Sequence, residues 1–351
     1  MPVEVATGAV LKQNSILMVP AGWWRRFCFS TAVLVLIASA VGSARAQTCL
    51  TTDDIEAATT TALINTAQRY FQMAAAGDAA SLRQNAIAGV AANFGGIEQA
   101  VKDNQSALAG GQAKARPPFL LKVEGNAPAE HAEFLCGVFG ANGQTANSVV
   151  FTLNNLPPGN YAVTPLDVTT SKEPYVVTFI LQQEAGAWKL GGYYVKASEV
   201  NGHDGQWYAQ KAREFKTKGQ LHNAWFYHVE ARDLLTYVPF MSTQATDQLY
   251  DEFQSGRPAD LPPSDLVAGS KTFHLTAMFP MAYDNNLDLV VRYSSASVAD
   301  TGAAFQDNIA VIKALVAKYP ELRDGFGGVV ARATETSGKD YGTLLMMNEI
   351  K

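Results

Sequence analysis

Apolar residues recur at helical spacing soon after residue 50. Four of them fall at intervals of three and four, which predicts one helix with a single buried face: Ile64, Ala67, Phe71 and Ala74. Asp53 and Glu56 precede this pattern in the arrangement of a capping box, so we expect the helix to begin there. Its predicted end is Gly77, because glycine accepts the left-handed backbone conformation that often terminates a helix.

A second helical tract follows at once. Asp78 stands where an N-cap residue is expected, and the sequence Ala76-Gly77-Asp78 therefore predicts a tight turn between two helices. Further helices are predicted over residues 82–94 and 97–108. The glycine and proline residues between 110 and 118 interrupt this pattern.

From residue 119 the pattern changes to short segments rich in valine, phenylalanine and tyrosine, separated by turn residues. These features are typical of β-strands. We expect strands at 135–139, 149–153, 161–165, 175–184 and 188–196.

Helical spacing returns after the turn-rich sequence at 201–205. Small and aromatic residues between 206 and 236 predict a helical hairpin, with Lys218-Gly219 at its turn. The tract 255–264 contains three prolines and predicts an extended connector.

The last hundred residues carry their own pattern. Alternating apolar residues predict two strands, at 273–279 and 287–293, and two more are expected at 327–333 and 342–347. The helix between the two pairs is predicted by five residues at spacings of four, three, four and three: Phe305, Ile309, Ile312, Val316 and Tyr319. We expect one antiparallel sheet with a helix on its face, in the order ββαββ.

These elements define an α+β fold class with N-terminal helices on a curved antiparallel sheet, a helical hairpin and a C-terminal sheet-plus-helix unit. The corresponding domains are 47–200, 201–254 and 255–351, preceded by a segment at 1–46.

That first segment has the pattern of an export signal. Arg25 and Arg26 precede an apolar region at about 27–43, which is short for a membrane span. The small residues Ala44 and Ala46 frame a cleavage site, and we expect cleavage between Ala46 and Gln47. The protein is therefore expected to be exported, to a bacterial periplasm or the extracellular medium.

Two alternatives to cleavage remain open. The apolar segment at 27–44 could stay in place as an inner-membrane anchor, with the two arginines on the cytoplasmic side. Met18 also precedes a signal of ordinary length, so translation could start at Met1 or at Met18.

The charge of the chain limits its partners. The full sequence has a net charge of −5, and its first 46 residues hold four basic side chains and one acidic one, so the expected mature chain has a net charge of −8. It has no sustained lysine and arginine block, and we therefore expect no nucleic-acid partner and no membrane contact beyond an uncleaved N-terminal segment.

Cysteine content adds one structural prediction. Cys28 lies in the expected signal, which leaves Cys49 and Cys136 in the mature chain. In an oxidising compartment such a pair is most simply a disulfide, although two free thiols would also fit the sequence.

The motifs of common catalytic and nucleotide-binding sites are missing from the sequence. It contains no GxSxG, no HExxH and no phosphate-binding loop, and no two of its five histidines have the i, i+3 or i+4 spacing of helical metal ligands. We expect no metal and no cofactor, and the catalytic residues stay undefined.

One segment collects aromatic and charged residues that could recognise a partner. It holds Trp225, Tyr227, His228 and Arg232, and its other reading is a half-buried helix with ordinary surface ion pairs.

The N-terminal half resembles a known superfamily. Arg69-Tyr70-Phe71, Gly77-Asp78 and Leu82, followed by strands that end in Ala187-Trp188-Lys189-Leu190 and Tyr193-Tyr194-Val195, are similar to the nuclear transport factor 2-like superfamily over residues 50–198. The resemblance implies a cone of helices and sheet whose concave side is the default ligand pocket. By position, Glu130, His131 and Glu133 are the nearest acid or base candidates.

The hairpin at 206–236 resembles a single tetratricopeptide repeat. Tyr208, Ala212, Phe215, Ala224 and Ala231 occupy its small and aromatic positions. Because one repeat cannot bury its own apolar face, this hairpin must pack on a neighbouring domain or on a partner.

Together these observations favour an exported, non-catalytic binding or assembly module whose partner is a protein or a small apolar ligand. Two alternatives remain, an isomerase or hydrolase that uses the cone as its pocket, and an anchored envelope protein. A buried carboxylate or histidine in the cone would favour the enzyme.

Overall fold

The computed structural model describes residues 47–283 and 286–351. The predicted signal at 1–46 lies outside the described residues, and Gln47, which follows its predicted cleavage site, is the first residue of β1. None of the described helices is both long and apolar enough to span a membrane.

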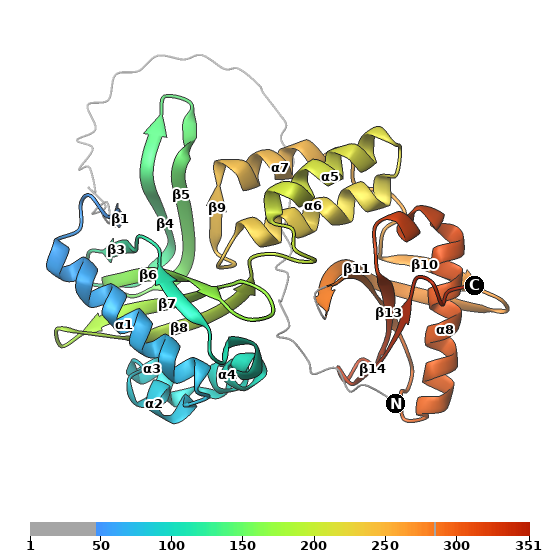
Figure 1. The fold of residues 1–351 in the computed structure, drawn as a ribbon, viewed down its shortest axis with the longest axis horizontal. Coiled ribbons are helices and arrows are strands. Elements are labelled where there is room, and N and C mark those ends of the chain that lie inside the picture. The colour runs from blue at the N-terminus through green and yellow to red at the C-terminus, as the bar shows by residue number, and fades with distance from the viewer. Residues whose placement is uncertain (1–46, 284–285) are drawn as a thin grey trace, which may run out of the picture. The chain divides into compact units, whose positions relative to one another are not determined.

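The first part of the fold places helices on one face of a curved sheet, as the α+β prediction required (Figure 1). The helices are α1 (Ala57–Ala75), α2 (Ala79–Gln84), α3 (Ala88–Ala92) and α4 (Gly95–Leu108). The sheet has the order β1-β3-β6-β7-β8, with β2 also paired to β6, and all its pairs are antiparallel. Its strands are β1 (Gln47–Leu50), β2 (Gln112–Ala115), β3 (Phe119–Val123), β6 (Gly159–Thr169), β7 (Tyr175–Glu184) and β8 (Ala187–Ala197).

A long β-hairpin rises from this sheet (Figure 1). It consists of β4 (Ala129–Gly140) and β5 (Gly143–Leu156), and the short strand β9 (Met241–Thr243) pairs with β5. The Cys49–Cys136 disulfide joins β1 to this hairpin, with a Cα–Cα distance of 5.1 Å. The pairing expected from the cysteine count is therefore present.

Three helices follow the sheet. They are α5 (Gly205–Thr217), α6 (Leu221–Leu235) and α7 (Gln244–Gln254). Helices α5 and α6 form the predicted hairpin, and Gly219 at its turn has a φ of +76°. The hairpin does not stand alone, because α6 packs against α7, β11 and the short 3-10 helix η1 (Pro320–Asp324).

The C-terminal sheet has the order β10-β11-β12-β13-β14. Its strands are β10 (Ser264–Ala268), β11 (Lys271–Tyr283), β12 (Asn286–Ser294), β13 (Gly328–Thr334) and β14 (Asp340–Met346), and α8 (Thr301–Lys318) lies between β12 and β13 in the sequence. The prediction of a purely antiparallel ββαββ sheet was wrong in two respects. Strand β10 adds a fifth strand, and β12 pairs with β13 in parallel because a strand–helix–strand crossover returns the chain in the same direction.

Several helix details also differ from the sequence prediction. Helix α1 begins after Glu56, whose side chain makes no capping hydrogen bond, so the predicted capping box does not form. The predicted helix over 82–94 is divided between α2 and α3. At the break, the amide of Ile87 donates to the carbonyl of Leu190 and the amide of Leu190 donates to the carbonyl of Asn85, so backbone pairing to β8 interrupts the helix.

Candidate functional site

The residues predicted as a recognition face do not share one exposed surface. Tyr227 and His228 are buried in α6, whereas Trp225 and Arg232 are half-buried. The phenol of Tyr227 donates to the carbonyl of Gly325 (2.6 Å), which ties α6 to the C-terminal unit. These four residues therefore hold elements together, and the structure supports the reading of a packed helix.

His228 illustrates this packing role. Its ring stacks on Phe253 of α7 with centroids 4.2 Å apart, and its Nδ1 atom is buried without a hydrogen-bond partner among the described residues. Burial, assisted by the nearby charge of Arg232, lowers the pKa of His228 to about 4. The ring is therefore neutral at physiological pH.

Aromatic and aliphatic side chains fill the space between the helices and the curved sheet. Tyr70 and Phe179 pack edge to face at 5.9 Å, and Phe179 contacts Tyr193 at 5.5 Å. Within the described residues 47–200, no carboxylate and no histidine side chain is buried. Glu130, His131 and Glu133, the candidates named by position, are exposed on β4 instead.

A cavity of about 300 Å³ lies elsewhere, between the sheet and the helical hairpin. Its lining comes from Arg116 after β2, from β7, from the end of β8, from the start of α5 and from the end of α6. Charged and hydrogen-bonding side chains converge there with a few apolar ones, so the lining is more polar than that of most small-molecule sites. The lining includes Arg116, Lys196, Glu199, Asp204, Leu234, Leu235 and Tyr237.

Arg116 forms one wall of this cavity. Its Nε and Nη2 atoms both donate to Oδ1 of Asp167, at 2.9 and 2.6 Å, and its guanidinium lies 5.7 Å from the centroid of the Tyr237 ring. The backbone amide of Arg116 donates to the carbonyl of Pro165, which fixes the segment against β6. Burial raises the pKa of Tyr237, so its phenol stays protonated and can donate a hydrogen bond.

Lys196 is the second cationic residue of the lining. It projects from β8, and its Nζ atom donates to the carbonyl oxygen of Asp233 at 2.6 Å and to Oδ1 of the same residue at 2.7 Å. The lysine side chain is 21% exposed and that of Asp233 is 62% exposed, so the pair is open to water on the side of α6. An ammonium group has three donors, and a third donor of Lys196 remains for a ligand.

Glu230 lies one turn before Asp233 on α6, close to the same lysine. Its side chain is 6% exposed. Burial, assisted by the Asp233 carboxylate, raises the pKa of Glu230 to about 7, although the charge of Lys196 opposes both effects. The acid therefore changes protonation close to neutral pH.

The opposite side of the cavity is acidic. Asp204 caps α5 by accepting from the amide of Trp207 at 2.9 Å through Oδ1. Glu199 has no hydrogen-bond or ion-pair partner among the residues that the structure describes, and its carboxylate is available to a donor. The cavity thus offers cationic groups that already have partners beside an acidic group that has none.

Gly205 brings the two helices of the hairpin together at the cavity. A Cβ atom at this position would lie 2.7 Å from Cγ of Leu235 and 2.9 Å from the carbonyl oxygen of Ala231. Only glycine permits this approach, which places the start of α5 beside the end of α6.

Sequence reasoning missed this site because its members are distant in the chain. Lys196 lies on β8 and Leu234 on α6, and no motif spacing connects them. The only signal in the sequence was the charged segment around residue 230, where Glu230 and Asp233 were visible as neighbours on a helix but their partner on β8 was not.

The remaining histidines serve structural contacts. His222 lies between two carboxylates, with Nδ1 2.7 Å from Oε1 of Glu321 and Nε2 3.0 Å from Oδ1 of Asp260. His203 stacks on Trp207, and His274 pairs with Asp265. Within residues 47–283 and 286–351, no group of histidine, cysteine and carboxylate side chains could hold a metal ion.

Comparisons with protein-family models, with curated proteins and with solved structures found no match to this chain.

Proposed function

We propose that this chain is an exported binding component that holds a small polar ligand in the cavity between Arg116 and Lys196. The observation that carries the proposal is the convergence of two cationic side chains, a free carboxylate and a buried phenol on one cavity of about 300 Å³. The export signal pattern and the Cys49–Cys136 disulfide support the assignment to an oxidising compartment.

The lining defines the ligand chemistry. Glu199 is available to accept from an amino or amide group, while Arg116, Lys196 and Tyr237 offer donors to a carboxylate or carbonyl. A ligand with both kinds of group, such as an amino acid or a short peptide, satisfies more of these atoms than the small apolar ligand expected from the cone. The core beneath α1 to α4 is filled with side chains and supports the fold.

Binding assays with a blocked variant test this proposal. A panel of amino acids, di- and tripeptides, polyamines and dicarboxylates is screened by thermal shift, and positive compounds are measured by calorimetry. Ser198→Trp places a large ring at the cavity wall and is expected to abolish binding. Ser171→Trp, in an exposed loop of the same domain, is the matched control and is expected to bind normally. Equal binding by both variants would contradict the proposed site.

The N-terminal segment requires its own measurement. Mass spectrometry of the protein from the periplasmic or secreted fraction is expected to show a first residue of Gln47. Recovery from the membrane fraction with the segment at 27–44 intact would instead support the anchored form.

A further inference from the structure

A charged cluster joins three segments that are far apart in the sequence. Helix α6 supplies His222 in its first turn, η1 supplies Glu321, and the connector between α7 and β10 supplies Asp260. The ring of His222 lies between the two carboxylates, with Nδ1 2.7 Å from Oε1 of Glu321 and Nε2 3.0 Å from Oδ1 of Asp260. None of the three residues lines the cavity beside Lys196, so the cluster is separate from the proposed ligand site.

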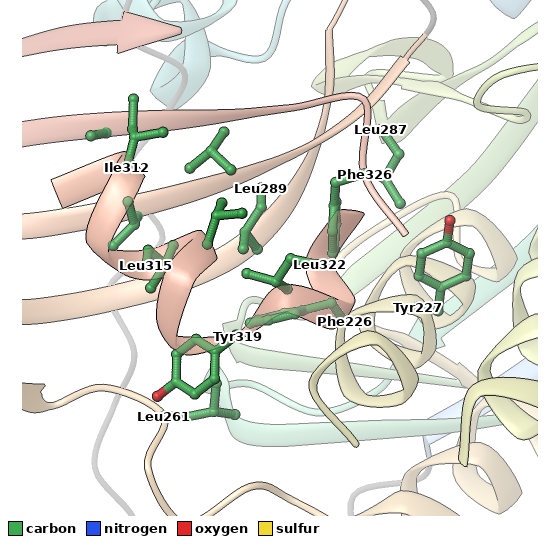
Figure 2. Close-up of a cluster of buried hydrophobic side chains, with 14 of the residues drawn as sticks. Phe226, Tyr227, Leu261, Leu287, Leu289, Ile312, Leu315, Tyr319, Leu322 and Phe326 are labelled. Atoms are coloured by element: carbon green, nitrogen blue, oxygen red, sulfur yellow. The ribbon is translucent and has the colours of Figure 1, made fainter. Parts of the chain in front are cut away.

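The cluster borders the apolar core of the C-terminal unit. The His222 ring packs on the ring of Tyr319, with centroids 4.1 Å apart. Figure 2 shows Tyr319 beside Leu261 of the connector, and Phe226 of α6 with Leu322 of η1. All four belong to one buried core. The His222 side chain is 12% exposed and that of Asp260 is 44% exposed, so the cluster reaches solvent on the side of the connector.

Both contacts of the ring require two ring protons. A carboxylate only accepts hydrogen bonds, and a neutral imidazole has one N–H donor and one acceptor nitrogen. A neutral His222 can therefore donate to Asp260 or to Glu321, and its other nitrogen then faces a carboxylate without a proton between them. The imidazolium donates to both carboxylates, and its positive charge offsets their negative charges. The complete cluster thus holds one proton more than the neutral ring supplies.

This additional proton lies on the ring rather than on Asp260. Burial alone would raise the pKa of Asp260, but hydrogen bonds from the Tyr319 phenol and from His222 lower it below its ordinary value. Asp260 therefore stays ionised over the pH range in which imidazole gains and loses its second proton.

The other titratable and charged groups near His222 have contacts of their own. Burial and the carboxylate of Asp260 raise the pKa of Tyr319, so its phenol stays protonated. Four charged side chains on the neighbouring segments contact a carbonyl, a ring or an amide: Arg257 at Pro262, Lys318 at Tyr319, Arg323 at Met347 and Ile350, and Asp324 at Gln220. Within residues 47–283 and 286–351, only Asp260 and Glu321 pair with the His222 ring.

We propose that this cluster is a pH-dependent clasp, closed while His222 carries two ring protons and weakened when the ring becomes neutral. The closed form binds more protons than the open form, so it is favoured at low pH and is lost as the pH rises. Opening frees the connector and η1 from the first turn of α6, while Leu261 and Leu322 stay in the apolar core. The clasp therefore makes the attachment of the C-terminal sheet to the helical hairpin depend on pH.

Amide hydrogen exchange in the connector and η1 tests the clasp. The amides of Leu261, Leu322 and Gly325 each donate a backbone hydrogen bond within these segments. In the unaltered protein, their protection relative to an unstructured peptide is expected to be on the order of tenfold lower at pH 8.5 than at pH 5.5. His222→Phe keeps a ring on Tyr319 but removes both donors, and it is expected to show the low protection at both pH values.

Asp260→Asn distinguishes a proton-dependent clasp from a purely structural contact. The amide that replaces the carboxylate can donate to the acceptor nitrogen of a neutral ring, while the other nitrogen donates to Glu321. This variant is expected to keep at pH 8.5 the protection that it has at pH 5.5. His274→Phe, at an exposed histidine of the C-terminal sheet, is the matched control and is expected to behave like the unaltered protein.

Nitrogen NMR of the His222 ring keeps the test decisive if His222→Phe does not fold. The unaltered protein is expected to have two protonated ring nitrogens at pH 5.5 and one at pH 8.5. The same ring protonation at both pH values would overturn the proposal. So would equal protection of the unaltered protein at both, or the same fall in protection with pH in His222→Phe or in Asp260→Asn.

Discussion

Lys196 on β8 and Asp233 on α6 form an ion pair of 2.7 Å that joins the curved sheet to the helical hairpin. The same lysine lines the cavity that we propose as the ligand site, and it lies close to the buried Glu230. The contact between the two elements therefore also sets the electrostatics of the site.

Replacement of this lysine is expected to destabilise the protein. Lys196→Met removes two charge-assisted hydrogen bonds to Asp233, and we expect a loss of about 1–2 kcal/mol in the free energy of unfolding by urea. Lys102→Met is the control, because its pair with Glu98 is exposed and contributes well under about 1 kcal/mol. Equal losses in the two variants would show that Lys196 is an ordinary surface residue.

Glu230 makes the stability of the protein depend on pH between about 4.5 and 7. Burial raises the pKa of this acid to about 7 from an ordinary value of 4.5, so the folded state holds its proton more tightly than the unfolded state. Its contribution to stability is complete below pH 4.5 and is lost as the pH rises to about 7. Glu230→Gln is expected to remove this loss, which makes the variant more stable than the unaltered protein by about 3 kcal/mol at pH 8. Urea titrations at pH 5 and pH 8 measure the difference, and a variant with no advantage at pH 8 would contradict the assignment.

His228 makes the free energy of unfolding change with pH in the opposite direction, and it does so at lower pH. Its folded pKa of about 4 lies below the ordinary 6.5, so stability is lost as the pH falls from 6.5 toward 4. His228→Phe is expected to abolish this acid-induced loss and to keep the stacking on Phe253. His274→Phe, at an exposed site, should leave the acid limb of the stability curve unchanged. The prediction fails if the two variants have the same acid limb.

The disulfide is expected to stabilise the long hairpin. Cys49 and Cys136 are separated by 87 positions, and closing a loop of that length contributes about 4 kcal/mol through the unfolded state. The double variant Cys49→Ala with Cys136→Ala should unfold at correspondingly lower urea concentration. Non-reducing mass spectrometry of the purified protein checks the bond itself, and two free thiols would refute it.

Local patterns predicted most of the helices and strands, but not always which of their residues face the core. Ala67, Phe71 and Ala74 of the predicted stripe are buried, whereas Ile64 is half-buried and its neighbour Leu63 is buried. In α8 the predicted Phe305 is likewise 40% exposed and its neighbour Ala304 is buried. A window of apolar residues defines the helix, but which of two adjacent residues faces the core depends on the partner surface. Tertiary pairing, as at the break between α2 and α3, cannot be read from local spacing.

The candidate site was even harder to predict from the sequence, because it is formed by tertiary contacts. The charged tract on α6 was visible in the sequence, but its meaning changed once Lys196 from β8 stood beside it. The burial that shifts the pKa values of Glu230 and His228 results from packing between elements far apart in the chain. Neither spacing nor composition contains that information.

Amide hydrogen exchange with and without a bound compound from the ligand panel tests the location of the site most directly. The account predicts new protection at residues 196–199, 204–206 and 234–237, which line the cavity, and no change at Tyr70, Phe179 and Tyr193 in the core beneath the helices. Protection confined to that core, or to the C-terminal sheet, would contradict a ligand site between Arg116 and Lys196.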